Sequence, residues 1–205
     1  MSAKASSPSS KSVPPPTKAA RRPVRAFVAL DLPDDARAIL ARLQERLPAG
    51  RASDPDTFHV TLAFLGEDVD DESLGMVHDG LAALRCAPVP LKVTGLGTLG
   101  AASPAVLVAE VAPAEPLITL QARVATCARR AGLVLERRRF RPHVTLARFR
   151  SRLDAPALER LRRFLEAEAR FHLDPVEVTS FALYASTLTK AGPLHEELAR
   201  YALTG

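Results

Sequence analysis

The sequence predicts an α+β fold made of two duplicated β-α-β-α-β halves, with two sheets facing a central groove and helices on the outside. Strand and helix signals alternate from Val24 to the C-terminus, and the pentapeptide His-Val-Thr-Leu-Ala occurs twice, at 59–63 and 143–147. Both copies fall on the corresponding strand of their half. The 205 residues are 47% hydrophobic, which suffices for a substantial core. We expect one bilobal domain over residues 23–205.

The first half contains three strands and two helices. Residues 25–32, 56–65 and 88–99 read as strands, and Pro33 opens the first helix. The apolar positions of the two helices follow the 3.6-residue period: Ala36, Leu40, Leu43 and Leu47, then Leu74, Val77, Leu81 and Leu84.

The second half repeats this order. Residues 104–111, 141–149 and 170–186 read as strands. The helical stripes between them are Leu117, Leu120, Val124, Cys127 and Ala131, then Leu158, Leu161 and Leu165. Residues 193–203 favour a helix by propensity and a final strand by position, and the period does not decide between them.

The basic charge of the chain belongs to its N-terminus. Residues 1–22 consist mostly of Ser, Ala, Pro and Lys, which predicts a disordered tail. The first 25 residues carry six basic and no acidic side chains, so a total of +5 leaves −1 for the remainder. An acid-free, Arg-bearing start is also found in transit peptides, but the prolines break any amphipathic helix. An anionic ligand must therefore be recognised by local clusters in the folded part.

Cysteine content and hydropathy indicate a cytoplasmic protein. Cys86 and Cys127 are too few for a disulfide framework and lie on apolar helical stretches, so we expect reduced thiols. No apolar run approaches the roughly 18 residues of a membrane span, and no secretory signal is present. We expect a monomer that does not bind membranes.

Each pentapeptide places an imidazole and a hydroxyl on one strand face. Residues two apart on a strand point the same way, so Thr57, His59, Thr61 and Ala63 share a face opposite to Phe58, Val60, Leu62 and Phe64. Arg141, His143 and Thr145 align in the same manner in the second copy. Two halves related by an approximate twofold would bring both polar faces together across a groove.

Two imidazoles on opposite sides of a phosphate suit the hydrolysis of a phosphodiester. One takes the proton of the attacking water and the other protonates the leaving oxygen, and histidine serves both roles because its pKa lies near neutrality. The hydroxyls of Thr61 and Thr145 can donate hydrogen bonds to phosphate oxygens. A metal site is the main alternative, with His78, His172 and His195 as spare ligands, but each strand offers only one His. We expect no metal and no cofactor.

Arginines around the second histidine favour an anionic ligand. The cluster comprises Arg137, Arg138, Arg139 and Arg141. Arg141 shares the strand face of His143 and can clamp a phosphate oxygen, whereas the other three also fit a solvated turn. Arg148 has the opposite parity to His143 and should point away, unless a bulge or the strand end turns it.

The segments RAFVALDLP, FHVTLAFLG and RFRPHVTLARF resemble the two-histidine phosphoesterase superfamily, specifically RNA 2′,3′-cyclic phosphodiesterases of the LigT type, from about Arg25 to the C-terminus. The resemblance implies hydrolysis of RNA 2′,3′-cyclic phosphate ends to 2′-phosphates without a metal. It implies His59 as proton donor and His143 as proton acceptor. Thr61, Thr145, Arg141 and Arg148 would bind the substrate.

The chain departs from the family pattern in its aromatic residues. It has no Trp, and SPAVLVAEV stands where relatives often carry an Arg and a Trp. We expect a stacking surface for a base either to be weaker or to come from Phe58, Phe64 or Tyr184, the last in a Tyr-x-Ser element with Ser186. Two other functions stay open: 2′,5′ joining of RNA ends by the reverse reaction, and RNA binding without catalysis.

Overall fold

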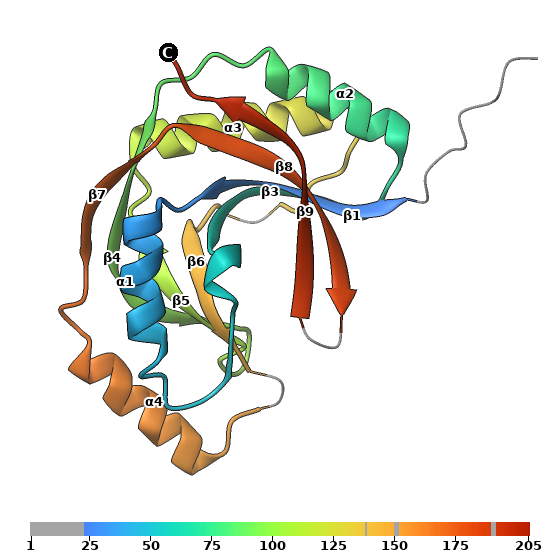
Figure 1. Ribbon diagram of the computed structural model, residues 1–205. Coiled ribbons are helices and arrows are strands. Elements are labelled where there is room, and N and C mark those ends of the chain that lie inside the picture. The colour runs from blue at the N-terminus through green and yellow to red at the C-terminus, as the bar shows by residue number, and fades with distance from the viewer. Residues whose placement is uncertain (1–22, 138, 150–151, 190–191) are drawn as a thin grey trace, which may run out of the picture.

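The computed structural model describes residues 23–137, 139–149, 152–189 and 192–205 (Figure 1). The expected disordered tail, residues 1–22, lies outside the described residues. The helices and strands follow the alternation that the sequence predicts, with two small additions, a two-residue strand and a single 3₁₀ turn before the first histidine.

The elements of the first repeat are β1 (Val24–Asp31), α1 (Asp34–Gln44), β2 (Arg51–Ala52), η1 (Pro55–Thr57), β3 (His59–Val69), α2 (Asp71–Ala82) and β4 (Val89–Leu99). Those of the second are β5 (Val106–Val111), α3 (Glu115–Arg130), β6 (His143–Arg148), α4 (Ala155–Ala167), β7 (Leu173–Val178), β8 (Ser180–Thr189) and β9 (Gly192–Ala202). The strand expected over 170–186 is therefore two strands, and the undecided last segment is a strand.

Hydrogen bonds join the strands of the described chain into one antiparallel nine-stranded sheet. The order is β7-β4-β5-β6-β3-β1-β8-β9, and β2 pairs with β6. At the centre, β3 and β6 meet through the single residue pair Val60–Val144. The α+β class is confirmed, and the two expected sheets are the two four-stranded arms of this sheet. The first arm is β3-β1-β8-β9 and the second is β6-β5-β4-β7.

The two repeats exchange strands between the arms. β4 belongs to the first repeat but pairs with β5 and β7 of the second, while β8 of the second repeat pairs with β1 of the first. The helices next to the histidine strands are also exchanged, because α1 contacts β6 and α3 contacts β3. Neither repeat can complete its own arm, so each depends on the other for its folded structure.

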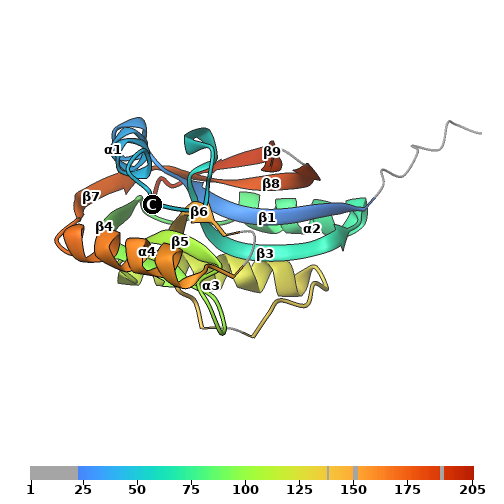
Figure 2. The same ribbon diagram turned by 90° about the horizontal axis from the view of Figure 1, so that it is seen from below.

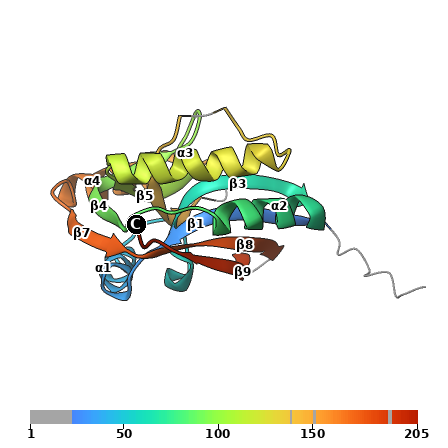
Figure 3. The same ribbon diagram turned by 90° about the horizontal axis from the view of Figure 1, so that it is seen from above.

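The core is one cluster of buried apolar side chains that runs through both arms. Figure 2 shows β1 and β3 side by side through the middle of the molecule. Figure 3 shows α2 and α3 packed along each other beside the first arm. Two helices begin at aspartates whose carboxylates accept backbone N–H groups: Asp70 for α2 and Asp154 for α4.

Candidate active site

Both pentapeptides open into one cavity of about 380 Å³ at the junction of the two arms. His59 and Thr61 of β3 line it from one side, and His143 and Thr145 of β6 line it from the other. The β8–β9 hairpin adds Pro193, Leu194 and His195, and β2 adds Arg51 and Ala52. The structure therefore brings together the two imidazoles and two hydroxyls that lie 84 residues apart in the sequence.

The two histidines are held in the same way. Nδ1 of His59 lies 2.7 Å from the carbonyl oxygen of Thr57, and Nδ1 of His143 lies 2.7 Å from the carbonyl oxygen of Arg141. A carbonyl only accepts, so Nδ1–H is the donor in both rings, and Nε2 carries the lone pair of the neutral form. Each ring thus keeps Nε2 available for proton transfer.

A bulge in each histidine strand changes which residues face the cavity. In β6, Val108 pairs with Thr145 and Leu107 with Ala147, so Leu146 is an extra residue in the ladder. Alternation restarts beyond it, and Arg148 lines the cavity with His143 and Thr145. The expectation from simple parity that Arg148 points away was wrong, and the bulge is the reason.

The first repeat has the same bulge. Val28 pairs with Ala63 and Ala29 with Thr61, so Leu62 is the extra residue in β3. Ala63 was expected beside His59, yet it is 6% exposed and belongs to the core. Phe64 takes the place that corresponds to Arg148, and the guanidinium of Arg25 lies 4.5 Å above its ring. Each arm therefore carries one arginine beyond its His-x-Thr pair: Arg25 against Phe64 in the first arm, and Arg148 in the second.

A glutamine from the exchanged helix donates a hydrogen bond to the carbonyl of each bulge residue. Nε2 of Gln44, the last residue of α1, donates to the Leu146 oxygen at 2.7 Å. Nε2 of Gln121 on α3 donates to the Leu62 oxygen at 3.2 Å. The Leu146 oxygen also accepts the backbone N–H of Ser53 at 2.9 Å, so Gln44 adds a second donor to this carbonyl next to the site. The sequence offered no periodic signal for this role.

The His59 ring is enclosed by aromatic neighbours. Phe27 of β1 stacks on it at 5.0 Å between ring centroids, and His195 of β9 meets it edge-on at 5.5 Å. The pKa of His59 is lowered to about 4, mainly by burial and also by the nearby His195, while the hydrogen bond to the Thr57 carbonyl opposes the shift. In the ligand-free groove His59 is therefore neutral near pH 7.

His195 is a third imidazole in the site, which the sequence suggested only as a spare metal ligand. Burial lowers its pKa, and the positive charges of Arg148 and Arg25 add to the effect. Its Nδ1 is buried and has no hydrogen-bond partner in the described part of the chain. The undecided secondary structure of the last segment hid its position, because strand pairing with β8 is what directs it at His59.

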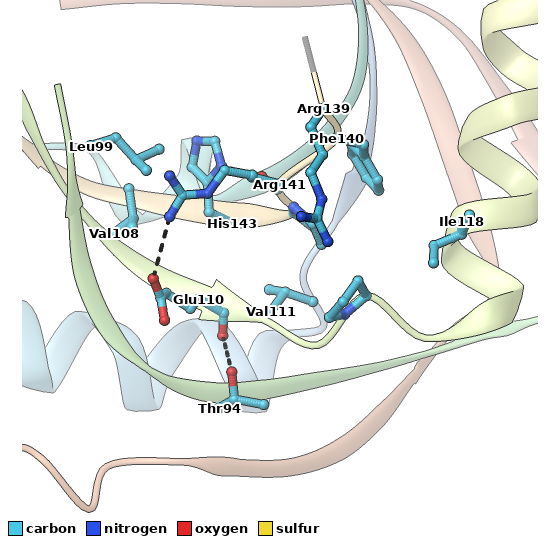
Figure 4. A pocket seen from close by; sticks show the side chains of 12 residues that line it. Thr94, Leu99, Val108, Glu110, Val111, Ile118, Arg139, Phe140, Arg141 and His143 are labelled. Carbon is cyan, nitrogen blue, oxygen red and sulfur yellow. Dashed lines mark hydrogen bonds and ion pairs between the residues drawn. The ribbon is translucent and has the colours of Figure 1, made fainter. Parts of the chain in front are cut away.

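Arg141 faces a neighbouring cavity. Together with His143 it lines a cavity of about 530 Å³ on the side of β6 that faces β5, where its Nη2 lies 3.9 Å from the Glu110 carboxylate (Figure 4). Arg139 lines the same cavity, whereas Arg138 lies outside the described residues. Arg148 and Arg51 therefore line the cavity that both histidines share, and Arg141 lies in the adjoining cavity, which His143 also lines.

The expected stacking residues are largely committed elsewhere. Phe58 is 3% exposed and part of the core, so its expected role was wrong. Phe64 lies under Arg25, and the Tyr184 ring stacks on Phe27 while its hydroxyl donates to Asp31 at 2.7 Å. A base must therefore find other surfaces.

Three further observations concern the described residues only. No group of three His, Cys, Asp or Glu side chains there is placed to hold a metal ion. None of the helices in that part of the chain is long and apolar enough to cross a membrane. Cys86 and Cys127 are both free thiols.

The paired His-x-Thr strands, which line one cavity from opposite sides, place this protein in the class of two-histidine phosphoesterases. Residues 32–185 match the model of the 2′-5′ RNA ligase superfamily, and the chain is a member of that family.

Individual relatives agree in sequence and structure. An RNA 2′,3′-cyclic phosphodiesterase of Aeropyrum pernix is 31% identical over 166 residues, which cover 78% of this chain and 92% of the relative. The crystal structure of E. coli LigT in its apo form superposes with a TM-score of 0.71 at 29% identity and covers 90% of this chain and 100% of LigT. The complex of E. coli LigT with 3′-AMP gives a TM-score of 0.71 at 28% identity, over 89% of this chain and 99% of LigT.

Proposed function

We propose that this protein hydrolyses RNA 2′,3′-cyclic phosphate ends to 2′-phosphates by paired acid and base catalysis, without a metal. The observation that carries the proposal is the shared cavity of His59 and His143, each with Nδ1 bound to a carbonyl and Nε2 left for proton transfer. The name of the Aeropyrum pernix relative and the 3′-AMP complex of E. coli LigT support this substrate class.

The reaction assigns one proton transfer to each histidine. Nε2 of His143 accepts a proton from the attacking water as the water oxygen bonds to phosphorus. Nε2–H of the protonated His59 gives a proton to O3′ as the P–O3′ bond breaks. The product is a 2′-phosphate with a free 3′-hydroxyl. Proton exchange with solvent then restores both rings. Thr61, Thr145 and Arg148 line the same cavity and hold the phosphate oxygens.

Substrate binding makes His59 take up the proton that it needs to act as the donor. His59 is neutral in the empty groove because burial lowers its pKa to about 4. A phosphate anion placed between the rings favours the charged imidazolium and raises that pKa. Binding of the anionic substrate is therefore coupled to proton uptake at His59, which prepares the acid only when there is a leaving oxygen to protonate.

The primary test is product identification in the presence of EDTA. Purified protein is incubated with a nucleoside 2′,3′-cyclic monophosphate or a short RNA with that end, and the phosphate isomer is determined. We expect the 2′-phosphate. His59→Ala and His143→Ala each lower the rate at least about a hundredfold. The matched control is His172→Ala, because His172 is exposed and its Nδ1 also binds the carbonyl two residues upstream. A metal-dependent reaction or a fully active histidine variant contradicts the proposal.

A sulfur-substituted substrate assigns the donor and the acceptor. Replacing O3′ by sulfur gives a leaving group that departs without a proton, so the acid becomes dispensable. We expect His59→Ala to regain most of its lost rate on this substrate and His143→Ala to regain none. The opposite pattern would exchange the two roles.

Joining of RNA ends is the second candidate, favoured by the family description. A bound 5′-hydroxyl would replace water as the nucleophile and give a 2′,5′ linkage through the same histidines. A joined strand in the assay supports this function, and absence of both products supports RNA binding without catalysis. Retention of both imidazoles and both hydroxyls in one cavity argues against that third function, because binding alone is better served by Arg or Lys.

We further propose that the protein acts as a cytoplasmic monomer. All groups that the mechanism uses come from one chain, and both cysteines are free thiols, as a reducing compartment favours. Light scattering of the eluted protein in a size-exclusion run at the assay concentration checks the monomer, and cell fractionation checks the compartment.

A further inference from the structure

Each site histidine has an acidic residue as its partner on the neighbouring strand, but only one of these two acids is held by hydrogen bonds from other side chains. Asp31 of β1 pairs with His59, and Glu110 of β5 pairs with His143. The Asp31 carboxylate accepts hydrogen bonds of 2.7 Å from the Tyr184 hydroxyl and from Nη2 of Arg200. The two arms thus provide an internal comparison at equivalent positions.

Glu110 lacks such a pair of donors. Within the described residues its carboxylate makes one ion pair, with Arg141 at 3.9 Å, and the side chains are 47% and 64% exposed. An exposed contact of this length contributes little. Glu110 and Arg141 are therefore free to exchange this contact for hydrogen bonds to a ligand, while the corresponding position in the first arm is already filled by protein groups.

The cavity of about 530 Å³ beside Glu110 has a lining that suits an aromatic ring with polar edges. His143 lines both this cavity and the phosphate cavity, so the two are adjacent. Figure 4 shows Glu110 and Arg141 on one side and Phe140 and Ile118 on the other. Ile118 is 40% exposed, which leaves apolar surface for a ring to cover. Such a mixture of apolar walls and a few convergent polar groups is typical of small-ligand sites.

The polar side of the cavity matches one nucleobase best. A carboxylate can accept from N1–H and N2–H of guanine together, and an adjacent guanidinium can donate to O6. Adenine and cytosine offer one donor beside a ring nitrogen that would face the carboxylate lone pair. Uracil offers one donor between two carbonyls.

We propose that this cavity binds the nucleobase of the nucleotide that carries the cyclic phosphate, and that Glu110 with Arg141 makes guanine the preferred base. The inference rests on the proposed function, since the phosphate between His59 and His143 fixes where the ribose lies. The base packs on the wall formed by Phe140 and Ile118, and its Watson–Crick edge meets Glu110.

Two measurements test the proposal. The first compares kcat/KM for the four nucleoside 2′,3′-cyclic phosphates and for a ribose 2′,3′-cyclic phosphate without a base. We expect guanosine to exceed uridine by about tenfold, and every nucleotide to exceed the base-free compound. Glu110→Gln lowers the guanosine-to-uridine ratio toward one, and Phe140→Ala lowers kcat/KM for nucleotides relative to the base-free compound. The control Glu72→Gln, an exposed acid on α2, leaves the ratio unchanged.

The second measurement is calorimetric binding of guanosine 2′-phosphate and uridine 2′-phosphate. Tighter binding of the guanosine compound that is lost in Glu110→Gln supports the base site even if no cyclic phosphate is hydrolysed, an outcome that would overturn only the proposed function. Equal rates and equal affinities for guanosine and uridine overturn the base site and leave the hydrolase intact. A guanosine preference that survives Glu110→Gln also overturns it.

Discussion

Burial of the His59 ring makes the stability of the protein depend on pH in a defined window. The pKa of His59 falls from 6.5 to about 4 on folding, with burial as the largest cause. Between these values the unfolded chain holds a proton on this ring and the folded protein does not. The free energy of unfolding therefore rises with pH across this window, and the contribution of His59 to it is lost as the pH falls from about 6.5 to about 4.

The size of the effect follows from the shift. One pKa unit corresponds to about 1.4 kcal/mol, so this group costs the folded protein about 3 kcal/mol at pH 4 relative to neutral pH. Domains of this kind are stable by roughly 5–15 kcal/mol, so the loss is readily measured. His59→Gln keeps a polar side chain of similar reach and removes the titration.

Urea denaturation of both proteins across this pH window provides the assay. We expect the variant to lose about 3 kcal/mol less than the wild type on acidification, and the His59 Cε1 proton resonance to titrate near pH 4. His172→Gln is the matched control for loss of an exposed histidine. Parallel stability curves for wild type and His59→Gln would refute the link between burial and the state of the ring.

Three further variants test other parts of the structure. Gln121→Ala leaves the Leu62 carbonyl without its side-chain donor, and we expect kcat to fall about tenfold with the fold retained, as checked by circular dichroism and steady-state kinetics. His195→Phe removes a neighbouring charge from His59, and we expect NMR titration to place the pKa of His59 closer to its ordinary value; an unchanged or lower value contradicts the assigned contact. Gly50→Ala introduces a Cβ 2.8 Å from the Phe149 ring at a φ of 95°, and denaturation should show a loss of about 1–3 kcal/mol. A stability equal to wild type would contradict both the close contact with Phe149 and the backbone strain at this position.

The sequence by itself determined most of the helices and strands and the side chains that we propose as the reacting groups. Apolar periodicity located the helices, and the repeated His-Val-Thr-Leu-Ala placed both imidazoles and both hydroxyls on strand faces, because these patterns depend only on local backbone geometry. The resemblance to two-histidine phosphoesterases named Arg148 as well, even though simple parity turned it away.

Only the tertiary structure decided which residues surround those groups. The bulge at Leu146 directs Arg148 into the cavity. The Leu146 carbonyl accepts a hydrogen bond from Gln44, which lies on a helix of the other repeat. His195 reaches His59 because β9 pairs with β8. The exchange of strands and helices between repeats, and the single-residue junction of the arms, arise from contacts between segments far apart in the chain. Such long-range pairings leave no periodic trace in a single sequence, which is why local patterns could locate the proposed catalytic groups but not their surroundings.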